Sequence, residues 1–398
     1  MSIGDAMVSE KLGQVPGILE EMDIDAWLLF ARETHTIREP CFDLVVGTNV
    51  TWASAFLLTR HGDRIAVVGS LDRANLEMHG HYREIVGYVG GISEDLRRIV
   101  SRSNPRRIAV NYSRDDVMSD GLTHGMYLSL LNVLEGTPYA SRLEPADRVV
   151  AALRGRKSPA EQARIRAACD ATEEIFDRLT PRLRAGLTER QLAALIREDM
   201  ERVGLAPAWD PEHCPAVFTG PDSAGAHAGP TDRSIEPGHV MNVDFGVRRD
   251  GYCSDLQRTW YFLRPDERVA PAAVQRGFDT IVEAIRLAAD ALRAGRPGGE
   301  IDQVARAHIT GRGYPEFPHA LGHQIGRTAH DGAGLLCPRW ERYGRLPDLP
   351  LEPGQCYTIE PRLPIPGHGI ATCEEIYVVT WDQAVPLSRP QERLYLVR

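Results

Sequence analysis

The sequence contains no apolar run of the roughly 20 residues that a membrane-spanning helix requires. Its amino terminus, MSIGDAMVSEKLGQ, also lacks the basic and then apolar pattern of a secretory signal peptide. Basic residues do not predominate, because 46 lysines and arginines face 55 aspartates and glutamates, a formal net charge of −9. These absences argue against a membrane or nucleic-acid partner, and we expect a cytoplasmic protein.

Several motifs of common enzyme classes are missing as well. The seven cysteines, spread from Cys41 to Cys373, include no CxxC pair, which is typical of reduced thiols and disfavours a structural zinc ribbon. The sequence has no GxxxxGK[ST], no strand-linked GxGxxG and no GxSxG, the usual signatures of phosphate binding and of serine hydrolases. What remains is an ordinary globular composition, 43% hydrophobic and 25% charged, over 398 residues, a length that suits two domains.

The boundary between the two domains is predicted near residue 155. Before it, short apolar strands alternate with helical stretches, which indicates an α/β domain. The predicted strands of this domain cover residues 25–30, 53–59, 64–69 and 107–113. After it, Ser158-Pro159-Ala160-Glu161 combines a capping serine, a proline at the first helical position and a glutamate three residues after the cap, so a helix begins there. We therefore predict domains of residues 1–155 and 156–398.

The segment MNVDFGVRRDGYCSDLQRTW, residues 241–260, carries two unusual aspartates. Asp244 interrupts an apolar strand, and Asp255 follows an Asp-Gly pair that predicts a hairpin turn. A two-residue turn places Asp255 opposite Gly246 and diagonal to Asp244, whereas a four-residue loop places the two aspartates directly opposite. In both registers they share one face. Unless that face is solvated, two such close carboxylates must share a proton or hold a cation.

A second cluster of polar residues lies in the carboxyl-terminal half. The stretch PHALGHQIGRTAHDGAG contains His319, His323 and His330 among many glycines, a composition that fits either a site or a polar loop. The spacing of His319 and His323 resembles a helical zinc motif, but the neighbouring glycines and proline disfavour a helix, and the glutamate of HExxH is absent.

Two glutamates at strand ends complete the candidate ligands. Glu360 ends the apolar strand in QCYTIEP, and Glu374 opens the next one in CEEIYVV. Together with Asp244 and Asp255 they contribute four negative charges, which two divalent cations would neutralise, with one imidazole completing the ligand set. Oxygen-rich ligation favours Mn²⁺, Co²⁺, Fe²⁺ or Zn²⁺ over metals selected by thiolates. Two such ions form a hydrolytic clamp that activates water and polarises a carbonyl.

With these motifs the sequence resembles the pita-bread metallopeptidases, the M24 family that includes methionine aminopeptidase, aminopeptidase P and prolidase. The resemblance covers nearly the whole chain: paired aspartates eleven residues apart, a GH-containing loop, TxEP written here TIEP, and a glutamate six residues before Thr380. It implies a small amino-terminal creatinase-type α/β domain followed by a pseudo-symmetric pita-bread α+β catalytic domain.

The resemblance also implies a role for each ligand. Asp244 would chelate one metal ion, His323 and Glu360 would bind the other, and Asp255 and Glu374 would bridge the two.

Further residues match the family's catalytic and substrate-binding positions. His227 matches a substrate-binding histidine, His330 matches the one that contacts the scissile carbonyl, and His319 lies where proline-specific members have another. Glu360 is expected to relay the proton as well as to bind metal. The chain departs from the family at Thr372, where proline-specific relatives usually have arginine, and Arg362 is a possible substitute for binding the substrate carboxylate.

The resemblance therefore implies a dinuclear-metal prolidase, an Xaa-Pro dipeptidase that contains manganese and forms a homodimer. An aminopeptidase P, which acts on longer proline-containing peptides, is the alternative. A creatinase-like amidinohydrolase is disfavoured, because that activity would not require the complete set of metal ligands. A pita-bread binding protein without catalytic activity is the alternative from another class, but such proteins typically lose ligands.

Overall fold

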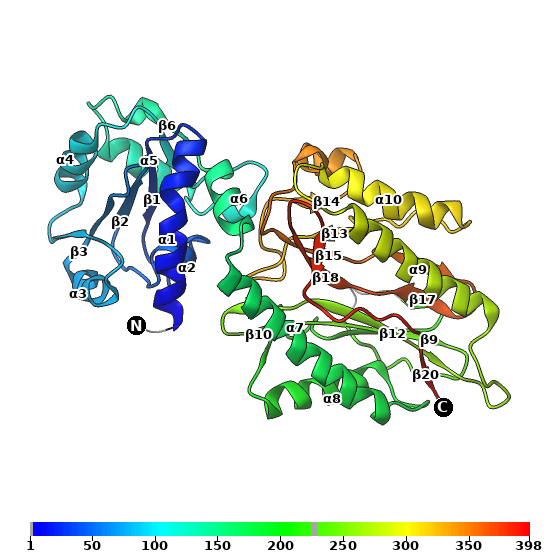
Figure 1. The fold of residues 1–398 in the computed structure, drawn as a ribbon. Coiled ribbons are helices and arrows are strands. Elements are labelled where there is room, and N and C mark those ends of the chain that lie inside the picture. The colour runs from blue at the N-terminus through cyan, green and yellow to red at the C-terminus, as the bar shows by residue number, and fades with distance from the viewer. Residues whose placement is uncertain (1–2, 224–228) are drawn as a thin grey trace. The chain divides into compact units, whose positions relative to one another are not determined.

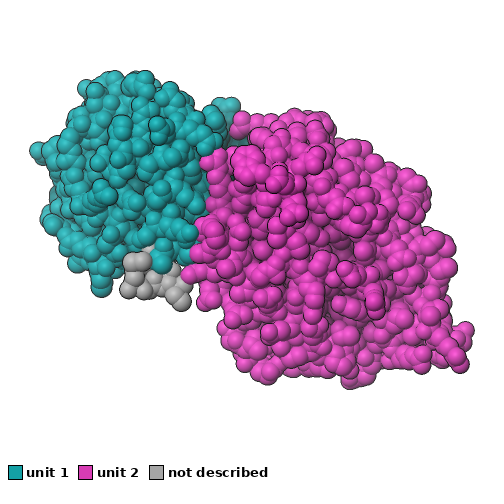
Figure 2. Space-filling view, viewed as in Figure 1, with its two compact units in different colours: residues 1–154 teal, residues 155–398 magenta. Residues whose placement is uncertain are grey.

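The amino-terminal strands form one six-stranded sheet in the computed structural model, which describes residues 3–223 and 229–398 (Figure 1). The chain divides into an amino-terminal unit, Met1–Arg154, and a carboxyl-terminal unit, Gly155–Arg398, which Figure 2 colours separately. Within the described residues, none of the helices combines the length and apolarity needed to span a membrane.

The sheet of the amino-terminal unit has the order β4-β3-β2-β1-β5-β6. Its strands are β1 (Ala26–Ala31), β2 (Ser54–Thr59), β3 (Arg64–Gly69), β4 (Glu84–Tyr88), β5 (Ile108–Val110) and β6 (Leu143–Pro145). Its helices are α1 (Ile3–Glu21), α2 (Phe42–Val45), α3 (Ser70–His79), α4 (Ser93–Ser103), α5 (His124–Val133) and α6 (Asp147–Gly155), with short 3-10 turns at Val117–Ser119 and Ala140–Arg142. The four predicted strands are confirmed with small shifts. β4 and β6 were not predicted, because both are short and neither is fully buried.

Strand β1 shows why the sheet is covered on both faces. All six of its residues are buried, and they alternate between two hydrophobic cores. Trp27 and Leu29 pack in the core that contains Leu12 of α1, whereas Leu28 and Phe30 pack in the core that contains Leu96 of α4. A continuous apolar run is the expected sequence of a strand buried on both sides.

The carboxyl-terminal unit contains two pairs of helices and a set of short sheets. The helices are α7 (Pro159–Leu179), α8 (Glu189–Arg202), α9 (Ala272–Ala291) and α10 (Gly298–Gly311), with 3-10 turns at Thr180–Arg182, Glu341–Tyr343 and Leu346–Asp348. The predicted start of α7 is confirmed, since Ser158 and Glu161 form a capping box with Pro159 at the first position. In Figure 1, α7 and α8 lie on one side of the strands, and α9 and α10 lie on the other.

The strands of this unit are mostly antiparallel. They are β7 (Ala206–Pro207), β8 (Ala216–Thr219), β9 (Val240–Phe245), β10 (Val247–Arg249), β11 (Tyr252–Cys253), β12 (Leu256–Phe262), β13 (Gly322–His323), β14 (Leu335–Leu336), β15 (Cys356–Ile359), β16 (Arg362–Ile365), β17 (Gly369–Thr372), β18 (Glu375–Val379), β19 (Ala384–Pro386) and β20 (Tyr395–Val397). The largest ladder has the order β20-β12-β9-β8, and a second has the order β15-β18-β19. A single bridge between Gln257 and Glu374 connects the two ladders.

The hairpin that carries the two aspartates has the two-residue turn. Asp250 and Gly251 both have positive φ, 49° and 79°, as a type I′ turn requires. The resulting register pairs Asp244 with Gln257, and Asp255 falls opposite Gly246, where the ladder is interrupted between β9 and β10. Gly246 is required here because a Cβ atom would lie only 1.7 Å from the carbonyl oxygen of Ser254. The glycine thus lets the chain around Asp255 approach β9.

Candidate metal centre

The two aspartates lie on the same face of the hairpin, within hydrogen-bonding reach of each other. Asp255 is buried and Asp244 is half-buried. Burial raises the pKa of Asp244 to about 7, and burial together with the neighbouring Asp244 and Glu360 raises the pKa of Asp255 well above its usual range. Of the four carboxylate oxygens, Oδ1 of Asp244 has no hydrogen-bond partner among the described residues.

Glu360 and Glu374 come from the β15-β18-β19 ladder and lie close to the two aspartates. The register of β15 and β18 pairs Ile359 with Glu375, so Glu360 and Glu374, each one residue beyond, lie opposite each other. Burial and the nearby Asp244 raise the pKa of Glu360 to about 8, and burial and Asp255 raise the pKa of Glu374 well above normal. Within the described part of the chain, Oε1 of Glu374 accepts no hydrogen bond.

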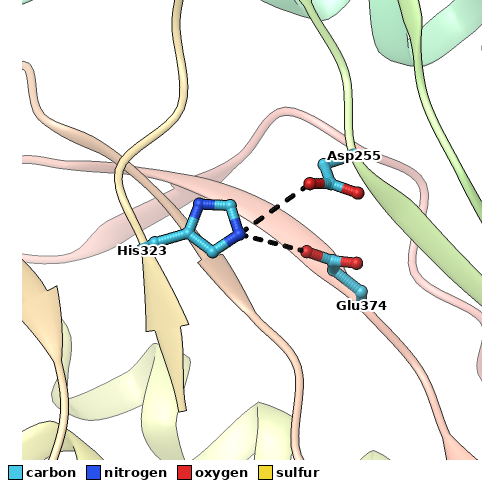
Figure 3. A group of neighbouring side chains, drawn as sticks. All are labelled: Asp255, His323 and Glu374. Atoms are coloured by element: carbon cyan, nitrogen blue, oxygen red, sulfur yellow. Dashed lines mark ion pairs between the residues drawn. The ribbon is translucent and has the colours of Figure 1, made fainter. Parts of the chain in front are cut away.

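His323, at the end of β13, turns its ring toward Asp255 and Glu374 (Figure 3). Its Nε2 lies 3.4 Å from Oε1 of Glu360, 3.8 Å from Oδ2 of Asp255 and 3.9 Å from Oε1 of Glu374. Its Nδ1 donates a hydrogen bond of 3.2 Å to the carbonyl oxygen of Gln324. Burial and the adjacent His330 lower the pKa of His323 to about 3, so the ring is neutral and Nε2 presents a lone pair.

This arrangement fits divalent cations. A lone pair and several carboxylate oxygens of the described residues converge on one place, and an uncompensated buried carboxylate costs several kcal/mol. Ligand atoms of Asp255, His323 and Glu374 all lie within 4.8 Å of one another, close enough to surround one ion. Oxygens without partners and raised pKa values are expected of carboxylates that a bound cation would neutralise.

A residue that the sequence analysis missed, Gln257, lies between the two glutamates. Its Nε2 donates hydrogen bonds of 3.1 Å to Glu374 and 3.3 Å to Glu360. Its Oε1 accepts a hydrogen bond of 2.8 Å from the hydroxyl of Thr372. The sequence could have indicated Gln257, because a side chain two residues after Asp255 in an extended strand points to the same face.

The histidine loop is anchored by a buried ion pair. Nζ of Lys157 lies 3.3 Å from Oδ2 of Asp331, and that oxygen also accepts a hydrogen bond from the backbone of Arg327. His330, just before Asp331, packs edge-on against His323 with ring centroids 4.2 Å apart. The structure therefore places His330 beside the candidate ligands.

The remaining predicted residues are His319, Arg362 and His227. Nδ1 of His319 donates to the carbonyl oxygen of Ala320, and its ring packs on Phe317 at 5.2 Å. Arg362 is half-buried on β16, directly opposite Thr372 on β17. His227 lies outside the described residues. The catalytic and substrate-binding roles of these residues stay predictions.

Comparisons with known proteins agree with this geometry. The sequence pattern described as metallopeptidase family M24 matches residues 163–381. The Xaa-Pro dipeptidase of Lactobacillus delbrueckii subsp. lactis is 27% identical over 314 residues, which cover 78% of this chain and 79% of that protein. The Xaa-Pro dipeptidase of Lactobacillus helveticus is 29% identical over 313 residues, 77% of each chain.

Solved structures share the fold over both units. The Xaa-Pro dipeptidase from Bacillus anthracis superimposes with a TM-score of 0.76 at 24% identity, covering 98% of this chain and 100% of that one. The X-Pro aminopeptidase from Thermotoga maritima MSB8 gives a TM-score of 0.72 at 23% identity, covering 97% and 99%. At these identities the likeness supports the fold, and the chemistry has to be argued from the side chains.

Proposed function

Because the chain belongs to metallopeptidase family M24, we propose that it is a metal-dependent prolidase that hydrolyses dipeptides with proline at the carboxyl end. The observation that carries the proposal is the convergence of the carboxylates of Asp255, Glu360 and Glu374 on the neutral imidazole of His323, with Asp244 beside Asp255. The two Lactobacillus proteins named as Xaa-Pro dipeptidases support this substrate class.

Five residues would hold two divalent ions. They are Asp244, Asp255, His323, Glu360 and Glu374. When bound, the ions would balance the four carboxylates, activate water and polarise the scissile carbonyl. We propose manganese as the metal, since oxygen-rich ligation with a single nitrogen suits it, although cobalt, zinc and iron suit the same set.

The protein's own side chains would handle the proton and the developing charge. Glu360 lies 3.4 Å from Nε2 of His323, within the proposed ligand set, and we assign it the transfer of the proton to the proline nitrogen. His330, whose ring contacts that of His323, is proposed to donate a hydrogen bond to the scissile carbonyl oxygen. His227 and His319 are assigned to substrate binding on the sequence pattern.

Arg362 is proposed to bind the carboxylate of the substrate. Arg362 on β16 pairs with Thr372 on β17. Thr372 is the position at which proline-specific relatives usually have arginine, so Arg362 lies on the neighbouring strand. It is half-buried near Glu360, and burial lowers the pKa of Arg362, an effect that the charge of Glu360 only partly offsets. A guanidinium is well suited to a carboxylate because it donates two parallel hydrogen bonds.

Substrates with and without a free proline carboxylate test this assignment. Arg362→Ala should raise KM for Gly-Pro far more than for the same dipeptide with an amidated carboxyl group, and Arg362→Lys should restore part of the difference. Equal loss on both substrates would make Arg362 a structural residue. In the wild type, hydrolysis of Gly-Pro but not of longer Xaa-Pro-Xaa peptides distinguishes a prolidase from an aminopeptidase P.

The location and assembly are also proposed. None of the seven cysteines, which all lie in the described residues, forms a disulfide bond, and this favours a reducing compartment such as the cytoplasm. A homodimer follows from the family resemblance, and light scattering of the purified protein checks it.

A further inference from the structure

The side chain of Gln257 forms a hydrogen bond with one carboxylate oxygen of Glu360 and with one of Glu374, and the other oxygen of each glutamate faces His323. Its Nε2 donates to Oε2 of Glu374 and Oε2 of Glu360, at 3.1 and 3.3 Å. The other oxygens, Oε1 of both glutamates, point toward Nε2 of His323, at 3.9 and 3.4 Å. Both carboxylates are thereby oriented with one oxygen toward the place where an ion would bind.

The hydroxyl of Thr372 fixes the direction of the Gln257 amide. Its one proton has two acceptors within reach, the nearer being Oε1 of Gln257 at 2.8 Å and the other the carbonyl oxygen of Pro361 at 3.1 Å. The reversed amide would press a carbonyl oxygen against two carboxylate oxygens. Thr372 is itself 2% exposed, and the hydroxyl of Thr259 donates to its carbonyl oxygen. The amide therefore has one favourable orientation in a rigid environment.

The backbone of Gln257 also connects the two ladders that supply the ligands. It is the cross-strand partner of Asp244, and its carbonyl oxygen accepts a hydrogen bond of 3.3 Å from the backbone of Glu374. Gln257 thus contacts three of the four carboxylate-bearing residues, two through its side chain and one through strand pairing.

We propose that Gln257, oriented by Thr372, is a positioning residue that sets the geometry of Glu360 and Glu374 for metal binding. A neutral amide can hold both carboxylates without supplying a positive charge that would compete with the ions. The inference rests on the proposed function only in that these two glutamates bind metal.

A matched pair of variants at Thr372 tests the hydrogen bond without removing a ligand. The dissociation constant for Mn²⁺ is measured on metal-stripped protein by competition with a chelating dye, in the absence of substrate. Thr372→Val, which keeps the shape and removes the hydroxyl, should weaken binding several-fold, whereas Thr372→Ser should bind as the wild type does. Gln257→Leu should weaken binding by about 10–100-fold, the usual effect of losing a partner that orients a ligand.

Thermal unfolding separates positioning from general stability. The rise in melting temperature on adding Mn²⁺ should shrink in Thr372→Val and remain in Thr372→Ser. Equal Mn²⁺ affinities for the two Thr372 variants, or wild-type affinity in Gln257→Leu, would overturn the inference while leaving the proposed function intact. A wild type that binds no divalent ion would overturn both.

Discussion

Glu374 and Glu375 are consecutive and equally buried, each 1% exposed, yet they are compensated in different ways. Glu375 is bonded on both oxygens, to Arg258 at 3.0 and 3.3 Å, to Ser388 at 2.6 Å and to the backbone of Gln391 at 2.9 Å. Glu374 accepts a hydrogen bond from Gln257, and its Oε1 has no partner among residues 3–223 and 229–398.

The alternation of β12 explains the difference. Arg258 and Gln257 are neighbours on that strand and point to opposite faces, so the guanidinium reaches Glu375 and the amide reaches Glu374. Burying either carboxylate costs several kcal/mol unless a counter-charge is present. Arg258 supplies that charge to Glu375, and the proposed cations would supply it to Glu374.

The largest effect on activity is expected from removing the charge of a proposed metal ligand. Asp255→Asn or Glu374→Gln should lower the metal content and bring Gly-Pro hydrolysis below detection, because each residue is expected to bridge the two ions. Metal analysis and hydrolysis rates are measured on the same preparations. Full activity in either variant would remove the dinuclear mechanism.

Removing the charge of Glu375, which is paired with Arg258, should instead lower the stability of the fold. Glu375→Gln leaves the guanidinium of Arg258 buried beside a neutral side chain, and breaking a buried pair in this way costs about 3–5 kcal/mol of unfolding free energy. Glu374→Gln is the matched control, compared by urea unfolding of metal-free protein, and it should lose little or no stability. Equal losses at the two positions would contradict the distinction between the faces.

Variants of His323 and His330, whose rings are in contact, should have different phenotypes. His330→Ala should reduce kcat/KM by about 10²–10³ with the metal content unchanged, the scale of losing one oxyanion donor. His323→Ala should reduce metal occupancy, since its Nε2 is the one nitrogen in the proposed ligand set. Interchanged phenotypes would mean that the roles of the two residues are reversed.

The smallest effect expected is a dependence of stability on pH in the metal-free protein. The pKa of Asp244, raised to about 7 by burial, means that the unfolded chain loses this proton at lower pH than the folded one. Stability should therefore fall as the pH rises from about 4 to about 7. Asp244→Asn should reduce this fall by about 1–2 kcal/mol, since a pKa unit corresponds to about 1.4 kcal/mol and the carboxyl is only half-buried.

That measurement has to be a difference between variants. Burial also raises the pKa of Glu39, in the amino-terminal unit, to about 7, so Glu39 contributes a fall of the same sign in the same range. Comparing the wild type with Asp244→Asn cancels this contribution. An identical pH dependence in the two proteins would show that Asp244 is not perturbed by its surroundings.

Local patterns were enough to predict the main features of the site region. The Asp-Gly pair predicted the hairpin, Ser158-Pro159-Ala160-Glu161 predicted the start of α7, and period two placed both aspartates on one face. The choice between the two hairpin registers was left open, because it depends on how many residues the turn uses. The structure resolves it with the two-residue turn at Asp250 and Gly251.

Contacts between distant segments could not be predicted in the same way. The bonds of Gln257 to Glu360 and Glu374 join residues more than 100 positions apart, and no local period encodes them. The buried pair of Lys157 and Asp331, separated by more than 170 positions, is of the same kind. The family pattern identified candidate ligands in advance, but it did not indicate the neutral side chain that holds two of them.

The central claim is that bound cations compensate the carboxylates on the Glu374 face and make the protein a prolidase. The most direct test is to titrate metal-stripped protein with Mn²⁺ and measure bound metal and Gly-Pro hydrolysis in the same samples. We expect no hydrolysis without metal, and activity that rises as binding approaches two ions per chain. Hydrolysis at the full rate by metal-free protein, or two bound ions with no cleavage of any Xaa-Pro bond, would contradict the account.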